Sequence, residues 1–145
     1  MLKPSGFELY EWLPKDFYEK YYPIYREKLW YMFDRGIKFS MQSIRRRYGC
    51  SFVMNDWIWG GRNHLRGWRP MDCETGAFVG QHKFGRAADS KPVSEITVEE
   101  IRKDILANPD HEDFKYITRI EMNVSWLHID CGDHPKKLLG IKKIY

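Results

Sequence analysis

Hydrophobic positions in the first third of the chain recur at helical spacing. Over residues 13–34 this spacing predicts helices, with Pro23 as a break or a first-turn residue. A similar pattern over residues 37–48 ends in Arg45-Arg46-Arg47, so we expect an amphipathic helix whose basic, solvated end suits the helix dipole. A capping-box motif opens a third helical pattern over residues 97–107.

The pattern changes to strand spacing further along the chain. Residues 116–122 and 124–131 alternate apolar with polar side chains, and Asn123 lies between them where a tight turn fits. We therefore expect a β-hairpin. Together these elements predict an α+β fold, with N-terminal helices, a small antiparallel sheet and the 97–107 helix packed against that sheet.

Residues 60–89 are rich in Gly, Arg and Trp and show little periodicity, which is typical of loops laid over a scaffold. The length of 145 residues is that of one domain, and no linker-like composition is found between Tyr48 and the C-terminus. We expect a single domain over residues 1–145, with a mainly helical part over 1–48 and a site-bearing core over 60–131.

Composition narrows the class of protein. Apolar residues make up 43% of the chain and aromatic residues 16%, so a packed globule is expected and a disordered tail is excluded. The chain has no apolar run of membrane-spanning length and no basic-then-apolar start, so we expect no membrane span, no secretory signal and synthesis in the cytoplasm. Cys50, Cys73 and Cys131 form no CxxC pair and are expected to be reduced, structural cysteines.

Two segments carry residues that suggest metal chemistry. His82 and Asp89 lie seven residues apart with small residues between them, and His128 lies on a predicted strand with Asp130 two residues later on the same face. A lone histidine beside a strand is more often a core or surface residue, but together the segments favour a site. Two histidines and one aspartate are a sufficient ligand set for catalytic zinc, which needs three protein ligands and an open position for water.

The two segments resemble a known family. Gly80-x-His82-x-x-Gly85-x-Ala87-x-Asp89, followed by Trp126-Leu127-His128-Ile129-Asp130, is similar to the motifs of the zinc D-alanyl-D-alanine carboxypeptidase family. That family also contains phage L-alanyl-D-glutamate endopeptidases and shares its fold with the hedgehog signalling domain. The resemblance covers mainly residues 66–131 and implies that His82, Asp89 and His128 bind zinc in a hedgehog/DD-peptidase-like fold. Gly80 departs from the usual Ser, which removes a hydroxyl but no ligand.

The resemblance also implies a residue that binds substrate. Arg66-Gly67-Trp68-Arg69-Pro70 looks like the family's Ser-Gly-Tyr-Arg segment, whose arginine binds a substrate carboxylate or carbonyl near the metal. A guanidinium can bind a carboxylate through two hydrogen bonds, so Arg69 is the candidate. The alternative is a surface arginine beside a tryptophan.

A hydrolytic site also needs a general base, which family members place as a Glu three residues before the last His ligand. Glu121 is the only acidic residue in that stretch, but it lies seven residues before His128. On one continuous strand this odd spacing would turn Glu121 away, whereas a hairpin would bring the two side chains onto adjacent strands. Asp130 is the rival, although it is better suited to orient an imidazole or an arginine from outside the ligand set. Asp133 and His134 are weaker candidates.

These residues lead us to expect a zinc metallopeptidase in which Glu121 is the base and Arg69 binds the substrate. The resemblance implies peptidoglycan stem peptides as substrates, cut by a D-Ala-D-Ala carboxypeptidase or an L-Ala-D-Glu endopeptidase. Such a protein, expected to be a monomer, would reach the cell wall after release or in a phage particle. The alternative is an inactive, zinc-stabilised binding module of the same fold. The net charge of +4 favours anionic material, but nucleic-acid binding explains neither motif, so we expect no nucleic-acid or membrane partner.

Overall fold

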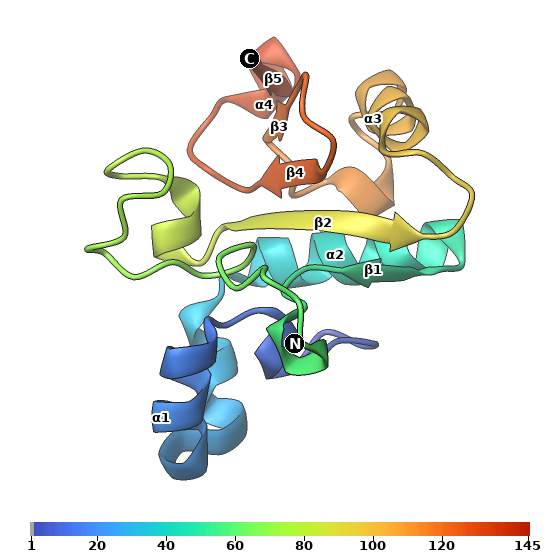
Figure 1. The fold of residues 1–145 in the computed structure, drawn as a ribbon. Helices are drawn as coiled ribbons and strands as arrows, with labels where there is room; N and C mark the ends of the chain where they lie inside the picture. The colour runs from blue at the N-terminus through green and yellow to red at the C-terminus, as the bar shows by residue number, and fades with distance from the viewer. Residues whose placement is uncertain (1) are drawn as a thin grey trace.

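The computed structural model describes residues 2–145 and combines helices with one sheet (Figure 1). The helices are α1 (Lys15–Tyr25), α2 (Arg35–Tyr48), α3 (Val98–Ala107) and α4 (Lys136–Leu139), and the strands are β1 (Ser51–Val53), β2 (Ala87–Val93), β3 (Arg119–Glu121), β4 (Leu127–Asp130) and β5 (Lys142–Ile144). Five 3-10 helices join them: η1 (Leu9–Glu11), η2 (Arg26–Met32), η3 (Trp57–Trp59), η4 (Gln81–Phe84) and η5 (Glu112–Phe114). The predicted α+β class is therefore confirmed. Within residues 2–145, no helix has the length and apolar character needed to cross a membrane.

The five strands form one sheet in the order β1-β2-β4-β3-β5. The pairs β1/β2, β2/β4 and β4/β3 are antiparallel, whereas β3 and β5 are parallel. The expectation of an antiparallel sheet is therefore wrong at one edge. The reason is that the Lys-rich C-terminal segment, whose lysines 142 and 143 stay exposed, still adds an edge strand through its backbone.

The predicted hairpin is present as the antiparallel pair β3/β4, with shorter strands than the pattern suggested. The connection runs over residues 122–126, and Asn123 adopts the left-handed backbone conformation with φ 60°. Asparagine tolerates this conformation better than most residues. The register pairs Arg119 with Asp130 and Ile120 with Ile129, so Glu121 is the next residue in line opposite His128.

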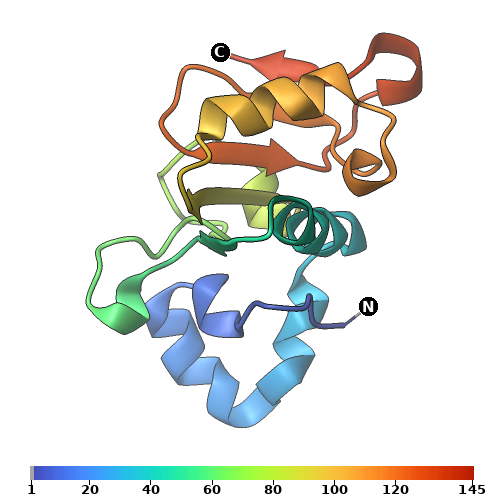
Figure 2. The same cartoon turned by 90° about the vertical axis from the view of Figure 1, so that its right-hand side faces the viewer.

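The sheet has one apolar face and one polar face, as strand alternation requires. Ala88, Ile120 and Ile129 are buried in the hydrophobic core, where α2 packs against β2 and α3 against β4 (Figure 2). Asp89 follows Ala88 on β2 and His128 precedes Ile129 on β4, so both side chains belong to the opposite face. Helices α2 and α3 thus cover the apolar side of the sheet and leave the other side for polar chemistry.

Residues 97–107 form the predicted helix with its capping box. The Thr97 hydroxyl accepts a hydrogen bond from the Glu100 amide, and the Glu100 carboxylate accepts one from the Thr97 amide. The helical patterns over residues 13–34 and 37–48 are also confirmed, by α1 and η2 in the first and by α2 in the second.

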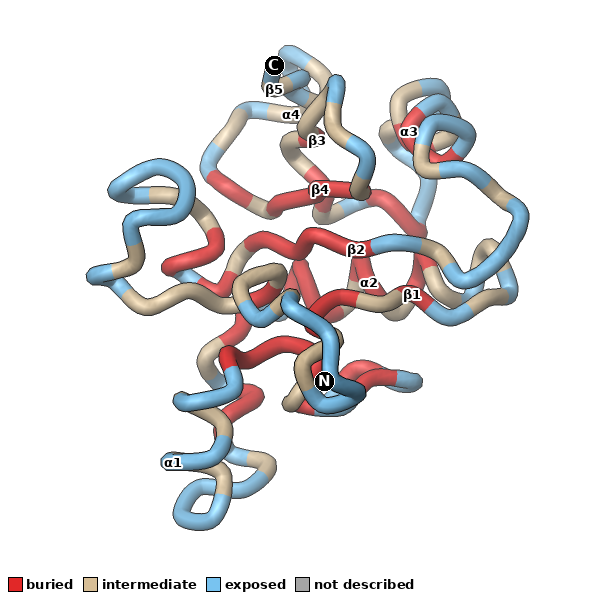
Figure 3. The backbone as a smooth tube through the Cα atoms, viewed as in Figure 1, coloured by how far each residue is buried: buried red, intermediate tan, exposed pale blue. Residues whose placement is uncertain are grey.

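Helix α1 projects from the rest of the molecule and contains no buried residue (Figures 1 and 3). Pro23 lies inside its last turn, so the first-turn interpretation is wrong. The helix ends two residues later, where Arg26 takes a φ of 50°. The chain on either side of α1 is held together by aromatic packing, because the Trp12 ring lies 5.5 Å from Trp30 and 5.0 Å from Phe33 between ring centroids.

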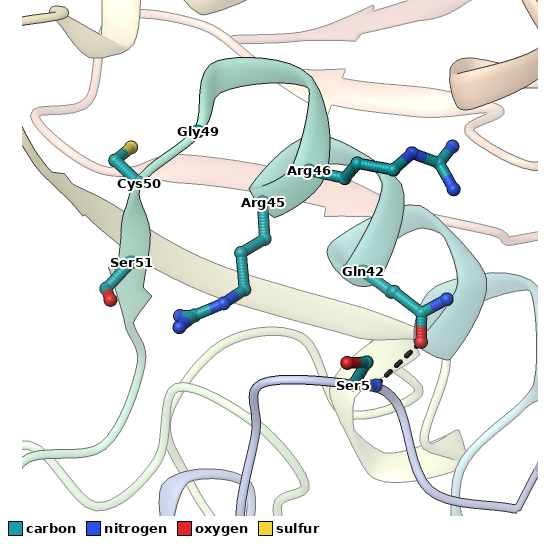
Figure 4. A pocket seen from close by; sticks show the side chains of 7 residues that line it. All are labelled: Ser5, Gln42, Arg45, Arg46, Gly49, Cys50 and Ser51. Atoms are coloured by element: carbon teal, nitrogen blue, oxygen red, sulfur yellow. Dashed lines mark hydrogen bonds between the residues drawn. The ribbon is translucent and has the colours of Figure 1, made fainter.

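The three consecutive arginines of α2 have different surroundings, so the solvated-face interpretation holds only for part of the run. Arg45 lies over the Phe7 ring and lines a cavity of about 410 Å³ beside Ser5 and Ser51 (Figure 4). Arg46 is mostly exposed, and Arg47 is largely buried against residues of α3 and η5.

Arg47 connects α2 to α3 through Asp104. Its guanidinium donates two hydrogen bonds to the Asp104 carboxylate, at 2.7 and 3.1 Å, and the Tyr48 hydroxyl donates a third. The hydrogen bonds from Arg47 lower the pKa of Asp104. The ionised carboxylate therefore stabilises the folded chain.

We expect Asp104→Asn to lower the free energy of unfolding by about 1–2 kcal/mol at pH 7, because it weakens these hydrogen bonds. Since the folded pKa is depressed, this stabilisation is present above the unfolded pKa of about 3.9 and is lost as the pH falls through the folded pKa. Urea titrations at pH 7 and near pH 2.5 measure both effects, with the exposed Asp110→Asn as control. An equal deficit at both pH values would contradict this role.

Candidate metal centre

The spacing of the first motif is explained by a reversal of the chain. His82 lies in the single turn of η4, which ends at Gly85 with a φ of 65°, and β2 then carries Asp89 back alongside. A Cβ on Gly85 would lie 2.0 Å from the carbonyl oxygen of Met32, so only glycine fits this turn. The expectation that this whole segment is loop is wrong, because Asp89 lies within the longest strand. Residues Ala87–Ser90 are buried throughout, which hides the alternation that usually marks a strand.

His128 comes from the neighbouring strand β4, where the register places it directly opposite Asp89. His82, Asp89 and His128 are all buried, and each offers a ligand atom within 4.8 Å of the other two. Motifs that are 39 residues or more apart in the chain therefore meet in one cluster that could hold a metal ion. We call these three residues the ligand cluster.

The protonation of His82 follows from its neighbours. Its Nδ1 lies 2.7 Å from the carbonyl oxygen of Gly67, which can only accept, so Nδ1 carries the proton and Nε2 keeps its lone pair. Burial lowers the pKa of His82, which favours this neutral form. The unprotonated Nε2 atom then lies 3.3 Å from the Asp89 Oδ2 atom. Two electron-rich atoms at this separation are the arrangement that a cation between them would stabilise.

The Gly67 carbonyl is itself fixed by the N-terminal part of the chain. The Trp68 amide donates a 2.8 Å hydrogen bond to the Trp12 carbonyl, and the Arg66 amide donates one of 2.9 Å to Asn55. The orientation of His82 therefore depends on residues that lie far from both motifs.

His128 is held between two carboxylates. Its Nδ1 lies 2.7 Å from Asp89 Oδ1, and its Nε2 lies 3.1 Å from Asp130 Oδ2. Burial opposes protonation of His128, but the hydrogen bonds to Asp130 and Asp89 outweigh it and raise its pKa to about 9. Burial would likewise raise the pKa of Asp89, but the hydrogen bond from His128 brings it well below its ordinary value. A metal ion would replace the Nδ1 proton, because a histidine ligand must be deprotonated.

Asp130 is almost fully buried and lies outside the ligand cluster. Besides His128, it accepts hydrogen bonds from Arg119 Nε at 2.7 Å and from the Gly132 amide at 3.0 Å. Burial acts to raise the pKa of Asp130, while the hydrogen bonds from His128 and Arg119 lower it overall. The carboxylate is thus ionised and oriented, and it contacts the imidazole nitrogen of His128 that faces away from Asp89.

Arg69 lies beside the cluster and is held on several sides. Its Nε donates to the Leu65 carbonyl at 2.7 Å, one Nη donates to the Thr75 carbonyl at 3.4 Å, and the other donates to Asp89 Oδ2 at 3.0 Å. The side chain is largely buried. Arg69 therefore orients the Asp89 carboxylate directly.

Glu121 reaches the cluster from the adjacent strand. Its Oε2 atom lies 3.8 Å from Nδ1 of His128, and its side chain is about one-third exposed. This juxtaposition follows from the antiparallel register of β3 and β4. The odd sequence spacing of Glu121 and His128 therefore does not keep their side chains apart, because the two lie on different strands.

These side chains border one cleft of about 460 Å³ on the polar face of the sheet. Its lining includes every site residue that the sequence indicated: Arg69, His82, Asp89, Glu121, His128 and Asp130. Asp133 and His134 do not line it. The cleft gives the ligand cluster an approach from solvent, which a metal that acts on a substrate requires.

Sequence reasoning missed Arg119, Gln81 and Ile144, which also line the cleft. Arg119 could have been found, because it lies two residues before Glu121 on the same strand and so shares its face. Ile144 could not, because its place depends on the unexpected pairing of β5 with β3.

Comparison with models of known protein families finds no match, and searches of the curated proteins and of the solved structures find none either.

Proposed function

We propose that the protein is a zinc-dependent metallopeptidase that cleaves peptide bonds in bacterial peptidoglycan stem peptides. The observation that carries this proposal is the convergence of two imidazoles and one carboxylate, with electron-rich atoms facing one another, at the wall of an open cleft. The motif resemblance adds the substrate and the reaction types, D-Ala-D-Ala carboxypeptidase or L-Ala-D-Glu endopeptidase. A phage-type lysin or tail-associated enzyme, acting as a monomer, is the setting that we propose.

The donor set fits zinc better than the other common divalent ions. Histidine nitrogens suit zinc, whereas calcium and magnesium prefer oxygen ligands throughout. His82, Asp89 and His128 supply three ligands, the number that catalytic zinc sites use. When bound, zinc would polarise the scissile carbonyl and favour ionisation of water.

Residues around the ligand cluster supply the rest of the chemistry. Glu121 faces the cleft beside His128, where its carboxylate can accept a proton from water and pass it to the leaving amine. Asp130 holds His128 in one orientation, and Arg69 does the same for Asp89. Arg69 also borders the cleft, where a substrate could contact it. Its contact with a substrate carbonyl or carboxylate stays a prediction.

Digestion of purified peptidoglycan tests this proposal. We expect zinc-loaded protein to release new amino groups, and chelator-stripped protein to release none until zinc is restored. Mass spectrometry of the fragments then identifies the bond, since loss of terminal D-Ala marks a carboxypeptidase and separation of L-Ala from D-Glu marks an endopeptidase. If the protein binds zinc and releases no amino groups, the peptidase proposal is wrong and the zinc-stabilised binding module takes its place.

Asp130→Asn is expected to weaken zinc binding by about 10–100-fold, because carboxylates that orient histidine ligands contribute this much to metal affinity. Titration with zinc against a competing chelator measures the change. Asp133→Asn is the matched control, since its side chain is fully exposed. Equal affinities of the two variants would show that His128 does not need this partner.

A further inference from the structure

Arg119 is the one cleft residue with positive charge that the proposed mechanism does not use. It lies on β3 two residues before Glu121, and its Nε is fixed by a 2.7 Å hydrogen bond to Asp130. The side chain is about four-fifths buried and lines the cleft. The guanidinium is therefore held in place before any substrate arrives, which reduces the entropic cost of binding.

The two terminal amino groups of Arg119 are not engaged by the protein. Among residues 2–145, Asp130 is the only carboxylate paired with Arg119, and no hydrogen bond from either Nη is found. Gly132 leaves room for this end of the side chain, because a Cβ there would lie 2.8 Å from Nη2. A largely buried guanidinium with free donors is the group that binds a carboxylate through charge-assisted hydrogen bonds.

Arg69, the other arginine of the cleft, differs in this respect. Each of its three guanidinium nitrogens already donates a hydrogen bond, to Leu65, Thr75 or Asp89. A substrate carboxylate would have to compete with Asp89 for a terminal amino group of Arg69. At Arg119 the Asp130 carboxylate engages only Nε and leaves both terminal amino groups for the substrate.

Two further cleft residues have buried polar atoms without partners. Among the described residues, the Gln81 Oε1 atom and the Trp126 indole N–H are buried and make no hydrogen bond. Both residues line the cleft. Buried polar groups are nearly always paired, and a peptide offers an N–H for the first and a carbonyl for the second.

We propose that Arg119 binds a free carboxylate of the substrate, so that the cleft selects peptides that carry one close to the scissile bond. This inference rests on the proposed function and names a specificity-determining residue for it. Asp130 bridges Arg119 and His128 through its two carboxylate oxygens, which places the bound carboxylate near the ligand cluster.

Paired probes test the assignment through binding, independently of hydrolysis. The probes are acetyl-D-Ala-D-Ala and acetyl-L-Ala-D-Glu, each with its carboxylates free and with them amidated. Calorimetric titrations use zinc-loaded Glu121→Gln protein, in which turnover of the probes is suppressed. We expect at least one free acid to bind about tenfold or more tighter than its amide, as charge-assisted hydrogen bonds imply.

Adding Arg119→Gln should reduce that preference to about twofold or less. A merely structural role through Asp130 would weaken acid and amide alike and leave the preference unchanged. Arg86→Gln is the charge control, since Arg86 lies outside the cleft lining, and this variant should keep the preference. Zinc content is measured in each protein.

A preference that survives in Arg119→Gln, or the absence of any preference in the parent, overturns the inference. Failure of the proposed function is distinguished by the wall digestion. If the acid preference depends on Arg119 but no amino groups are released, carboxylate recognition stands and the peptidase does not.

Discussion

Replacing Glu121 by glutamine is expected to lower the rate of stem-peptide hydrolysis by about 10²–10⁴-fold, the range for loss of a general base. Glutamine has nearly the same shape as glutamate but cannot accept a proton at neutral pH. Because Glu121 is not one of the three clustered ligands, zinc content should stay at the wild-type level. The measurement is the initial rate of amino-group release from peptidoglycan, together with the metal content of the same samples.

Glu95→Gln provides the control for the change of charge, because Glu95 is exposed and lies outside the cleft lining. If the Glu121→Gln protein hydrolyses the substrate at the wild-type rate, Glu121 is not the base and Asp130 becomes the candidate. That outcome would be surprising on the geometry, since Asp130 already accepts hydrogen bonds from His128, Arg119 and the Gly132 amide. Loss of zinc from Glu121→Gln would instead make Glu121 a contributor to the metal site.

His82→Ala is expected to remove the stabilisation that zinc gives to the fold. A ligand that binds only the folded state at 1,000 times its dissociation constant adds about 4 kcal/mol to the free energy of unfolding. In wild type we expect an increment of this order when zinc is added to chelator-treated protein. In His82→Ala the gain in the free energy of unfolding on adding zinc should fall close to zero, because one of the three proposed ligands is lost from a buried position.

The increment is measured by urea unfolding with and without zinc in each protein. This within-protein difference separates metal binding from any direct effect of the substitution on folding. His64→Ala, at an exposed histidine outside the cluster, should keep the wild-type increment. If His82→Ala keeps both the wild-type stabilisation by zinc and the wild-type zinc content, the proposed site is wrong.

The sequence was informative about the ligand cluster because motif spacing reports local geometry. The glycine and the two alanines between His82 and Asp89 indicated that the backbone passes close to another part of the molecule, and the structure places a turn at Gly85 and buried strand at the alanines. Both motifs could therefore be found without knowing the fold. The hedgehog/DD-peptidase-like topology stays a prediction, as does the proposed division into a helical part and a core.

What could not be predicted depends on pairing between distant segments. The strand character of Ala87–Ser90 was hidden by burial on both faces, and β5 was hidden by its lysines. A hairpin that brings Glu121 beside His128 was expected from the sequence, but the exact register of β3 against β4 was not, because a five-residue connection does not specify it in advance. The link from Arg47 to Asp104 spans 57 residues and leaves no local signal.

The hydrogen bond from His82 to Gly67 also bears on how far the site could be transplanted. A graft of residues 60–131 onto another scaffold would carry all three proposed ligands, yet it would leave behind Trp12 and Asn55, which hold the Gly67 segment in place. The imidazole could then exchange tautomers and rotate, and part of the metal affinity would be spent on ordering it. A portable form of this centre therefore has to include the earlier segments that contain Trp12 and Asn55.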